Sequence, residues 1–506
     1  MNYSAFSIFL IGALLIFANL GSAPLFDVDE AVFAQASKEM LLSKDWINPT
    51  YNGVNRYDKP ILIYWLMCIT YSLFGVNEFS ARLPSSLSGL LLALSLYFFS
   101  RKYLSKDKSI YVLIPLVFSP YFFVYTRAAV TDMTLTLFIT LALLSFYSDK
   151  KFLNNYGFHT FTALAFLTKG LIGIVFPYLI SIAFILFTKD YKRLKSIFNP
   201  VGIVIFLILS LPWPVAQYNR NGFEFIEQFF LKHHFQRYTD VISGHKGPFY
   251  YYLIAIIIGL LPWSFLLYKA LKETWYTRKD ILVFSTLWLL VVIGFFSLST
   301  TKLPNYILPA VPAVVLLIGY VMQEVDKRWF KALIILSALS LSVLFFVIPT
   351  YAEKYIPYNL NWFYFMGAIN IGTIFLFLLP NNKFGQISLR LIAIIVSMTI
   401  MLLTVAYKGL PLAGLYLQGD LKKYSLYAKE RLKDEEKITV YKINKPSILF
   451  YSDRKIIWVG SQGDMQELLN KQDKQILITK RKFVEELTSF GFRVVEQGRE
   501  YALLER

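Results

Sequence analysis

The chain has 506 residues, of which 56% are hydrophobic, 17% aromatic and only 17% charged, and its mean hydropathy is +0.50. Soluble domains carry roughly 25% charged residues, so this chain lacks the polar side chains that would cover a soluble protein of this size. The single cysteine, Cys68, excludes a disulfide framework. The net charge of +18 does not indicate a nucleic-acid partner, because Lys and Arg cluster in short gaps between apolar runs. The composition predicts a polytopic α-helical membrane protein that contacts membrane lipids.

Apolar stretches long enough to cross a bilayer recur along the first 408 residues. We expect about thirteen spans, near residues 4–20, 83–100, 110–126, 132–147, 158–168, 170–188, 201–217, 249–268, 281–298, 305–323, 332–349, 362–380 and 390–407. The first stretch follows no basic segment, so we expect it to be retained as a span rather than cleaved as a secretory signal. Residues 61–75 are apolar but contain Tyr64, Trp65 and Tyr71, which favours a helix along the membrane interface.

The Lys and Arg residues between these stretches lie mostly on one side. If the N-terminus is inside, one set of short loops holds nineteen of them and the opposite set holds four, namely Arg127, Lys169, Lys302 and Lys354. The positive-inside rule then places residues 21–82, residues 218–248 and the C-terminal segment outside.

From about residue 409 the chain becomes more polar. Strands are predicted at 437–443, 447–451, 455–459 and 476–479, and helices at 420–433 and 481–489. We therefore expect a transmembrane domain at 1–408, whose outer loops 21–82 and 218–248 form the site, and a small soluble α/β domain at 409–506.

Carboxylates near membrane depth are costly and need a reason. Asp27, Asp29 and Glu30 lie within four positions just after the first span. A helix beginning here explains about one of the three acids, as a cap or as a favourable charge at the helix dipole. Asp132 lies at the outer end of another span. It could either cap that helix or act as a functional acid, and the sequence leaves both interpretations open.

Outward-facing cations accompany these acids. Lys169 and Lys302 oppose the charge trend of the topology, and the loop 51–60 adds the pair Asp58 and Lys59. Residues 233–245 contain three of the four histidines. Such a set suits an anionic ligand, for example a phosphate, held by Lys and Arg beside an acid/base or metal-binding carboxylate.

The order of these motifs resembles that of the bacterial aminoarabinose transferases acting on lipid A. These enzymes belong with the dolichyl-phosphate-mannose protein mannosyltransferases, in the GT-C class of integral-membrane glycosyltransferases. The motifs that carry the resemblance are Asp29-Glu30-Ala31, Asn52-Gly53, Asp58-Lys59-Pro60, Arg82-Leu83-Pro84, Asp132, Lys169-Gly170, His234-Phe235-Gln236-Arg237-Tyr238, Pro248-Phe249 and Lys302-Leu303-Pro304-Asn305-Tyr306.

The resemblance assigns roles to individual residues. Asp29, in its Asp-Glu motif with Glu30, and Asp132 match the essential acids of the family. Lys59, Arg237 and Tyr306 match positions that hold the phosphate of the lipid-linked donor, and we add the outer cations Lys169 and Lys302 to this set. Asp58 stands where the aminoarabinose transferases usually have a zinc-binding Glu, with a later histidine, here His234, as its partner. A divalent metal such as zinc at Asp58 and His234 is therefore implied by the resemblance alone.

The resemblance also implies an activity and a location. The expected reaction is transfer of a sugar, with inversion, from a polyprenyl-phosphate donor such as undecaprenyl phosphate to lipid A or a related envelope glycolipid. It would take place at the outer face of the bacterial inner membrane. Protein O-mannosylation remains an alternative, and a transporter or flippase of lipid-linked sugars is a third, although its charges would lie nearer the bilayer centre. A membrane scaffold would not need Asp29, Asp132, Lys59 and Arg237 on one side. The sequence has no Gly-rich dinucleotide fingerprint, so we expect no nucleotide cofactor.

Overall fold

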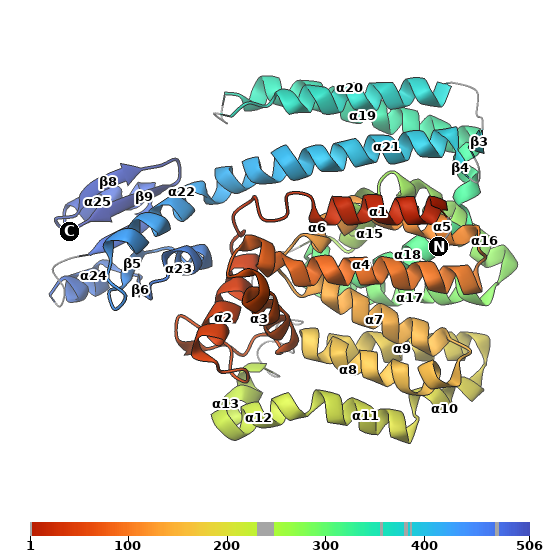
Figure 1. The fold of residues 1–506 in the computed structure, drawn as a ribbon, viewed down its shortest axis with the longest axis horizontal. Coiled ribbons are helices and arrows are strands. Elements are labelled where there is room, and N and C mark those ends of the chain that lie inside the picture. The colour runs from red at the N-terminus through yellow and green to blue at the C-terminus, as the bar shows by residue number, and fades with distance from the viewer. Residues whose placement is uncertain (1–2, 230–246, 355–357, 379–382, 385–386, 471–474) are drawn as a thin grey trace. The chain divides into compact units, whose positions relative to one another are not determined.

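The computed structural model describes residues 3–229, 247–354, 358–378, 383–384, 387–470 and 475–506 (Figure 1). The chain divides into two compact units, each built from separate stretches of sequence. The first unit comprises Met1–Leu20, Tyr57–Ile63 and Arg82–Lys408, and the second comprises Gly21–Arg56, Tyr64–Ala81 and Gly409–Arg506. The first outer loop is therefore grouped with the C-terminal segment for most of its length, which the sequence did not reveal.

The first unit is almost entirely helical in its described residues. Its helices are α1 (Tyr3–Phe17), most of α4 (Glu78–Tyr103), α5 (Lys108–Val117), α6 (Pro120–Thr126), α7 (Asp132–Tyr147), α8 (Phe158–Lys169), α9 (Ile172–Thr188), α10 (Leu194–Ile197), α11 (Pro200–Ser210), α12 (Pro212–Asn221), α13 (Phe223–Ile226), α15 (Tyr251–Gly259), α16 (Leu267–Thr277), α17 (Asp280–Leu298), α18 (Val311–Tyr320), α19 (Arg328–Ala352), α20 (Asn361–Leu378) and α21 (Leu389–Thr404). The short strands β3 (Lys383–Phe384) and β4 (Ile387–Ser388) pair antiparallel.

Six helices in the described residues are long and apolar enough to cross a membrane, or eight if each of two bent helix pairs forms one span. Other apolar helices, such as α1 and α7, are shorter than 18 residues. The polytopic helical architecture is thus confirmed, whereas the expected count of thirteen spans is not. Apolar length in the sequence does not reveal where a helix breaks.

Prolines account for the breaks in two predicted spans. The stretch 110–126 forms α5 and α6, which meet at an angle of 65°. Pro120 occupies the first turn of α6, and the Ser119 hydroxyl accepts a hydrogen bond from the backbone N–H of Phe122. The stretch 249–268 breaks at Leu260–Pro262, with a bend of 115°. Proline lacks a backbone N–H and is favoured in the first turn of a helix, and at these two breaks Pro120 and Pro262 lie where a new helical segment starts.

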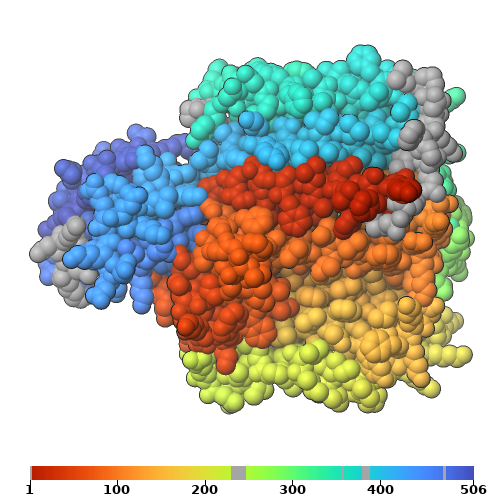
Figure 2. Space-filling view, in the orientation of Figure 1, coloured from red at the N-terminus to blue at the C-terminus, as the bar shows by residue number. Residues whose placement is uncertain are grey.

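Helices α7, α8 and α9 pack against one another, and α8 also contacts α11. The contact between α8 and α9 is close, because a Cβ atom on Gly173 would lie 2.3 Å from the backbone carbon of Ala165. Helices α19 and α20 pack as a pair along their lengths, and they form one edge of the first unit, coloured teal in Figures 1 and 2.

The second unit contains the acidic segment and the C-terminal α/β fold. Its elements are α2 (Asp29–Ser43), most of α3 (Leu62–Phe74), the hairpin β1 (Thr50–Tyr51) and β2 (Val54–Asn55), α22 (Leu410–Arg431), β5 (Ile438–Tyr441), α23 (Pro446–Ser452), β6 (Ile456–Val459), α24 (Gln462–Leu469), β7 (Ile476–Lys480), α25 (Val484–Thr488), β8 (Arg493–Gln497) and β9 (Tyr501–Glu505). The five-stranded sheet has the order β6-β5-β7-β9-β8, in which β5 is parallel to β6 and β7, and β9 is antiparallel to β7 and β8.

The sheet has an apolar core on each face. Ile476 and Ile478 of β7 belong to one core, which includes residues of α22 and α23. Leu477 belongs to the other core, together with Met465 of α24 and Leu487 of α25. Burial of both faces explains why these strands are continuous apolar runs rather than alternating patterns.

The small C-terminal α/β fold agrees with expectation, but one predicted strand is wrong. Residues 447–451 belong to helix α23, which begins with Pro446 and is buried along its whole length. A fully buried run of this length has no periodicity that separates helix from strand. Helix α24 and strands β8 and β9 were not predicted, although the Ser461 and Asp464 side chains form a capping box at the start of α24.

Candidate functional site

Three of the expected site residues come together in the first unit. The Nζ atom of Lys169 lies 2.6 Å from Oδ1 of Asp132; the Asp132 side chain is buried and the Lys169 side chain is 16% exposed. The same Nζ atom lies 5.5 Å from the centre of the Tyr306 ring, which packs on Phe296. A carboxylate, an ammonium group and a phenol therefore form one cluster, which we call the Asp132 cluster.

The ends of two helices create this cluster. Asp132 is the first residue of α7 and Lys169 is the last residue of α8, and the two helices pack as an antiparallel pair. An acid at a helix N-terminus and a base at a C-terminus both interact favourably with the helix dipoles. Gly170 ends α8 with a φ of +75°, a conformation that glycine adopts without steric cost. The N-cap of α7 is Thr131, and the Asp132 carboxylate accepts its hydrogen bond from Lys169.

Lys302 has a different role from the one expected. Its ammonium group donates hydrogen bonds to the carbonyl oxygens of Phe296, Ser297 and Ser299 at 2.9, 2.6 and 2.7 Å. A lysine has three N–H donors, and all three are used at the C-terminal end of α17. These bonds favour capping of this helix over the expected phosphate-binding role of Lys302.

Asp58 and Lys59 lie next to each other in the first unit and are both largely buried. The Lys59 Nζ atom donates to the backbone carbonyl of Asp58 at 3.0 Å and lies 3.6 Å from Asp58 Oδ2. Arg237 and His234 lie outside the described residues. Among the residues that the structure does describe, no group of three or more His, Cys, Asp or Glu side chains is placed to hold a metal. Asp58 is thus the one described member of the expected metal pair.

In the second unit, the three acids of the first outer loop have separate environments. Asp29 is the first residue of α2 and its side chain is exposed. Glu30 is buried and accepts a hydrogen bond from the backbone N–H of Phe26 at 3.0 Å. Asp27 does not cap α2. Its two carboxylate oxygens accept hydrogen bonds from the backbone N–H and the hydroxyl of Ser447, at 2.8 and 2.7 Å.

Asp27 lies in a partly desolvated position. Burial raises the pKa of Asp27 above its ordinary value, while the Ser447 hydrogen bonds and the nearby charge of Lys445 act in the opposite direction. The side-chain amide of Gln418, with its nitrogen towards the carboxylate, donates a further bond at 2.8 Å. Asp27 therefore makes structural bonds, which leaves Asp29 as the exposed acid of this segment.

Several polar contacts of the second unit were not predicted from the sequence. Lys38 of α2 contacts Asp453, and Glu39 accepts bonds from Thr50 and from the backbone N–H groups of Asn52 and Gly53. The Asn52 side chain in turn pairs with both backbone groups of Ile456 at the edge strand β6. Lys38 and Asp453 are more than 400 positions apart in the sequence. No local pattern signals such a pair.

The fold of this chain matches that of a solved membrane transferase. The structure of ArnT from Cupriavidus metallidurans bound to undecaprenyl phosphate superimposes with a TM-score of 0.84, covering 100% of this chain and 98% of that one at 21% identity. The first unit with its spanning helices and the C-terminal α/β fold therefore define a polytopic membrane protein with the fold of that transferase.

The sequence matches agree with the fold. The model of the dolichyl-phosphate-mannose-protein mannosyltransferase family matches residues 58–215. An uncharacterized protein of Aquifex aeolicus (strain VF5) is 33% identical over 65% of this chain and 75% of its own length. The undecaprenyl phosphate-alpha-4-amino-4-deoxy-L-arabinose arabinosyl transferase 2 of Pseudomonas fluorescens (strain Pf0-1) is 32% identical over 63% of this chain. The match spans 58% of that transferase's length. The chain belongs to the dolichyl-phosphate-mannose-protein mannosyltransferase family of integral-membrane glycosyltransferases.

Proposed function

We propose that the protein is an inverting glycosyltransferase that moves a sugar from undecaprenyl phosphate to lipid A or a related envelope glycolipid. The Asp132 cluster carries the proposal, because it combines a buried carboxylate, an ammonium group and a phenol in a chain of this family. The names of the arabinosyl transferase relatives support the donor and the pentose-like sugar.

The reaction is one displacement at the anomeric carbon. An acceptor oxygen forms a new bond to this carbon while the bond to the phosphate oxygen breaks, and undecaprenyl phosphate leaves with the electron pair. Stabilising the charge that grows on the phosphate is the main electrostatic task. Lys59, Lys169 and Arg237 supply positive charge for it, and the Tyr306 hydroxyl supplies a neutral donor. Lys169 donates one N–H to Asp132, so Asp132 orients this lysine and the other two N–H groups can face the phosphate.

Asp29 is assigned to the acceptor. If the acceptor is a hydroxyl group, the exposed carboxylate of Asp29 orients it and takes its proton. If the acceptor is a phosphate of lipid A, no proton has to be removed, and Asp29 positions the acceptor or binds an amino group on the sugar. Glu30 is buried and holds the backbone of Phe26, so it supports the acidic segment rather than the substrate.

A divalent metal such as zinc at Asp58 and His234 remains part of the proposal. Asp58 is a suitable oxygen ligand, but its carboxylate already lies 3.6 Å from the ammonium group of Lys59. A metal here would neutralise charge near the donor phosphate. No step of the proposed reaction depends on it.

We also propose that the thirteen apolar stretches span the bacterial inner membrane, and that Asp29, Asp132 and the C-terminal α/β fold face the periplasm. The strong excess of Lys and Arg in one set of short loops supports this orientation.

Protein O-mannosylation is the second candidate function, because the matching family model carries that name over residues 58–215. One experiment separates the two. Purified protein is incubated with undecaprenyl-phosphate aminoarabinose or with undecaprenyl-phosphate mannose, and with lipid A or a Ser/Thr-rich peptide as acceptor. Mass spectrometry of each acceptor identifies the product, with heat-denatured protein as the control. A mass increase of lipid A by the aminoarabinose residue supports the proposal, and mannosylated peptide supports the alternative. No product with either acceptor contradicts both.

A further inference from the structure

The acidic segment of the second unit is tied to the C-terminal fold close to Asp29. Helix α2, which begins at Asp29, packs against helix α23 of the C-terminal fold. Helix α23 is short and buried along its length, so it is a fixed support for α2.

Three hydrogen bonds join the C-terminal fold to the residues just before Asp29. Asp27 accepts two hydrogen bonds from Ser447 in the first turn of α23. Two residues earlier, the backbone N–H of Leu25 donates to the Tyr451 hydroxyl at 2.9 Å. The Tyr451 hydroxyl in turn donates to Glu78 at 3.0 Å, and Glu78 is paired with Lys422 of α22 at 2.6 Å. The C-terminal fold therefore binds the chain at Leu25 and Asp27, and the first turn of α2, which begins with Asp29, follows directly.

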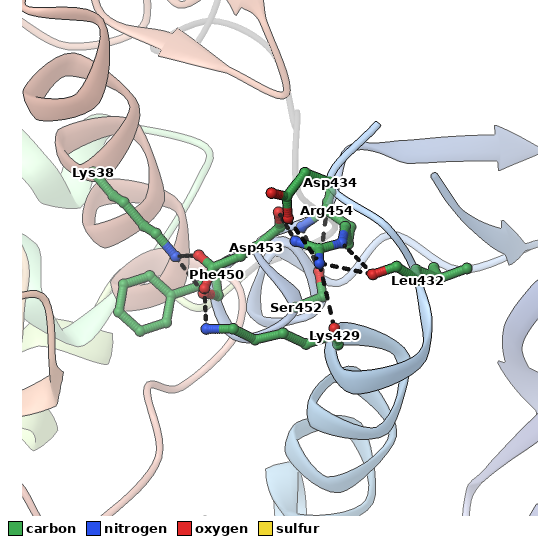
Figure 3. A network of polar contacts seen from close by, with 8 residues as sticks. All are labelled: Lys38, Lys429, Leu432, Asp434, Phe450, Ser452, Asp453 and Arg454. Atoms are coloured by element: carbon green, nitrogen blue, oxygen red, sulfur yellow. Dashed lines mark hydrogen bonds and ion pairs between the residues drawn. The ribbon is translucent and has the colours of Figure 1, made fainter. Parts of the chain in front are cut away.

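A second tie holds α2 nearer its middle (Figure 3). The Lys38 ammonium group contacts Asp453 and donates to the carbonyl oxygen of Phe450 at 2.9 Å. Asp453 also pairs with Lys429 of α22, and the adjacent Arg454 donates to the Leu432 carbonyl at 2.8 Å. Burial and the nearby Lys429 lower the pKa of Lys38 to about 8. This tie anchors the helix, whereas the Asp27 tie fixes where its first turn begins.

We propose that Asp27 and Ser447 are positioning residues for the acid Asp29, so that the C-terminal fold takes part in catalysis by orienting this carboxylate. The inference rests on the proposed function of Asp29. Movement of the first turn of α2 would carry the Asp29 carboxylate with it, and a displacement of about 1 Å in a reacting group can cost up to about a hundredfold in rate. Asp27 fixes the backbone just before this turn through bonds to both the N–H and the hydroxyl of Ser447.

The test compares variants that remove one bond or both. Ser447→Ala removes the hydroxyl bond but keeps the backbone N–H, so we expect kcat for sugar transfer to fall about tenfold. Asp27→Ala removes both Ser447 bonds and the Gln418 bond, and we expect a fall of about a hundredfold. KM for the undecaprenyl-phosphate donor should stay within about twofold in each variant, because the donor phosphate is assigned to other residues. Ser447→Thr keeps the hydroxyl and should restore most of kcat.

A matched control separates positioning from loss of folding. Lys423→Ala removes an exposed ion pair with Glu496 in the same unit, without touching α2, and should leave kcat unchanged. In the double variant Asp27→Ala/Ser447→Ala, kcat should fall no further than in Asp27→Ala, since both changes break the same tie. Melting temperature is measured for every variant, and only variants that melt within a few degrees of the unmodified protein are compared.

The outcomes distinguish this inference from the proposed function. Full kcat in Asp27→Ala and Ser447→Ala, with active unmodified protein, would overturn the positioning role while the transferase stands. Equal loss of kcat and of donor affinity would also overturn it, because a general structural defect affects both. If the unmodified protein transfers no sugar, the proposed function fails. Hydrogen exchange in residues 25–32 then still tests the tie, which predicts faster exchange in Ser447→Ala than in Lys423→Ala.

Discussion

Lys169 and Asp132 form a largely buried ion pair of 2.6 Å, in which Asp132 is the first residue of α7 and Lys169 is the last residue of α8. Neither residue had a local partner in the sequence. Their contact depends on the packing of α7 against α8 and on the helix end at Gly170. The pair therefore forms only in the folded protein, where it holds two candidate site residues together.

Removing both members of this pair should destabilise the first unit less than the more damaging of the two single removals. Lys169→Met or Asp132→Asn leaves one charge buried without its partner, which typically costs about 3–5 kcal/mol. The double variant removes both charges, so its loss in melting temperature should be smaller than that of the more damaging single variant. Thermal unfolding of the purified protein in detergent measures this, with the exposed Lys150→Met as the control. Additive losses would show that the two side chains do not interact.

Lys302 should be needed for stability rather than for donor binding. Lys302→Met removes three hydrogen bonds from the carbonyl groups at the end of α17. Charge-assisted hydrogen bonds are worth about 1.5–3 kcal/mol each and are not additive, so we expect a fall of several degrees in melting temperature. Donor affinity, measured by retention of undecaprenyl phosphate, should fall less than in Lys169→Met. A larger loss of donor in Lys302→Met would return this lysine to the phosphate site.

The sequence predicted the class of fold and indicated Asp132, Lys169 and Tyr306, which the structure brings together, because these signals are local. Apolar length identifies the spanning helices, and the order of the charged motifs identifies the family. The failures arise where distant contacts decide. Residues 447–451 form a helix where a strand was predicted, because a run that is buried on all sides carries no periodicity that separates the two. Asp27 was interpreted as a possible cap, whereas its partner Ser447 lies 420 positions away.

The stability of the second unit should depend on pH through Asp27. Burial raises the pKa of Asp27 above its ordinary value of 3.8. The folded state therefore binds this proton more tightly than the unfolded state, so the contribution is present in full below pH 3.8 and is lost as pH rises through the folded pKa. Asp27→Asn cannot titrate. Its melting temperature relative to the unmodified protein should therefore improve as pH rises across the acid range. If the melting temperatures of Asp27→Asn and of the unmodified protein change in parallel with pH, the pKa of Asp27 is not raised.

Gln462 tests the proposed orientation. This residue begins α24 and is exposed, so a cysteine at this position is accessible to a labelling reagent. In a Cys68→Ser background, Gln462→Cys should react with an impermeant maleimide in intact spheroplasts. Lys150→Cys, in a loop assigned to the cytoplasm, should react only after lysis. The reverse pattern would place the C-terminal fold inside and would overturn the proposed site at the outer face.

Asp29 and Lys59 should affect different steps, because they carry opposite charges and are assigned to different substrates. Lys59→Ala and Arg237→Ala each remove a partner from the donor phosphate. The loss of one charge-assisted bond is about 1.5–3 kcal/mol, or roughly ten- to a hundredfold in donor affinity. Asp29→Asn is nearly isosteric and removes a negative charge, so donor affinity should hold or improve while turnover collapses.

The same variant decides whether Asp29 is only a helix terminus. Asparagine serves about as well as aspartate at the start of a helix, so a purely structural Asp29 predicts near-normal turnover in Asp29→Asn. Donor affinity and release of undecaprenyl phosphate are measured on the same purified sample. If Asp29→Asn keeps its melting temperature and its donor affinity but loses turnover, the chemistry is assigned to this exposed carboxylate. Near-normal turnover removes Asp29 from the reaction and, with it, the reason for Asp27 and Ser447 to hold its backbone in place.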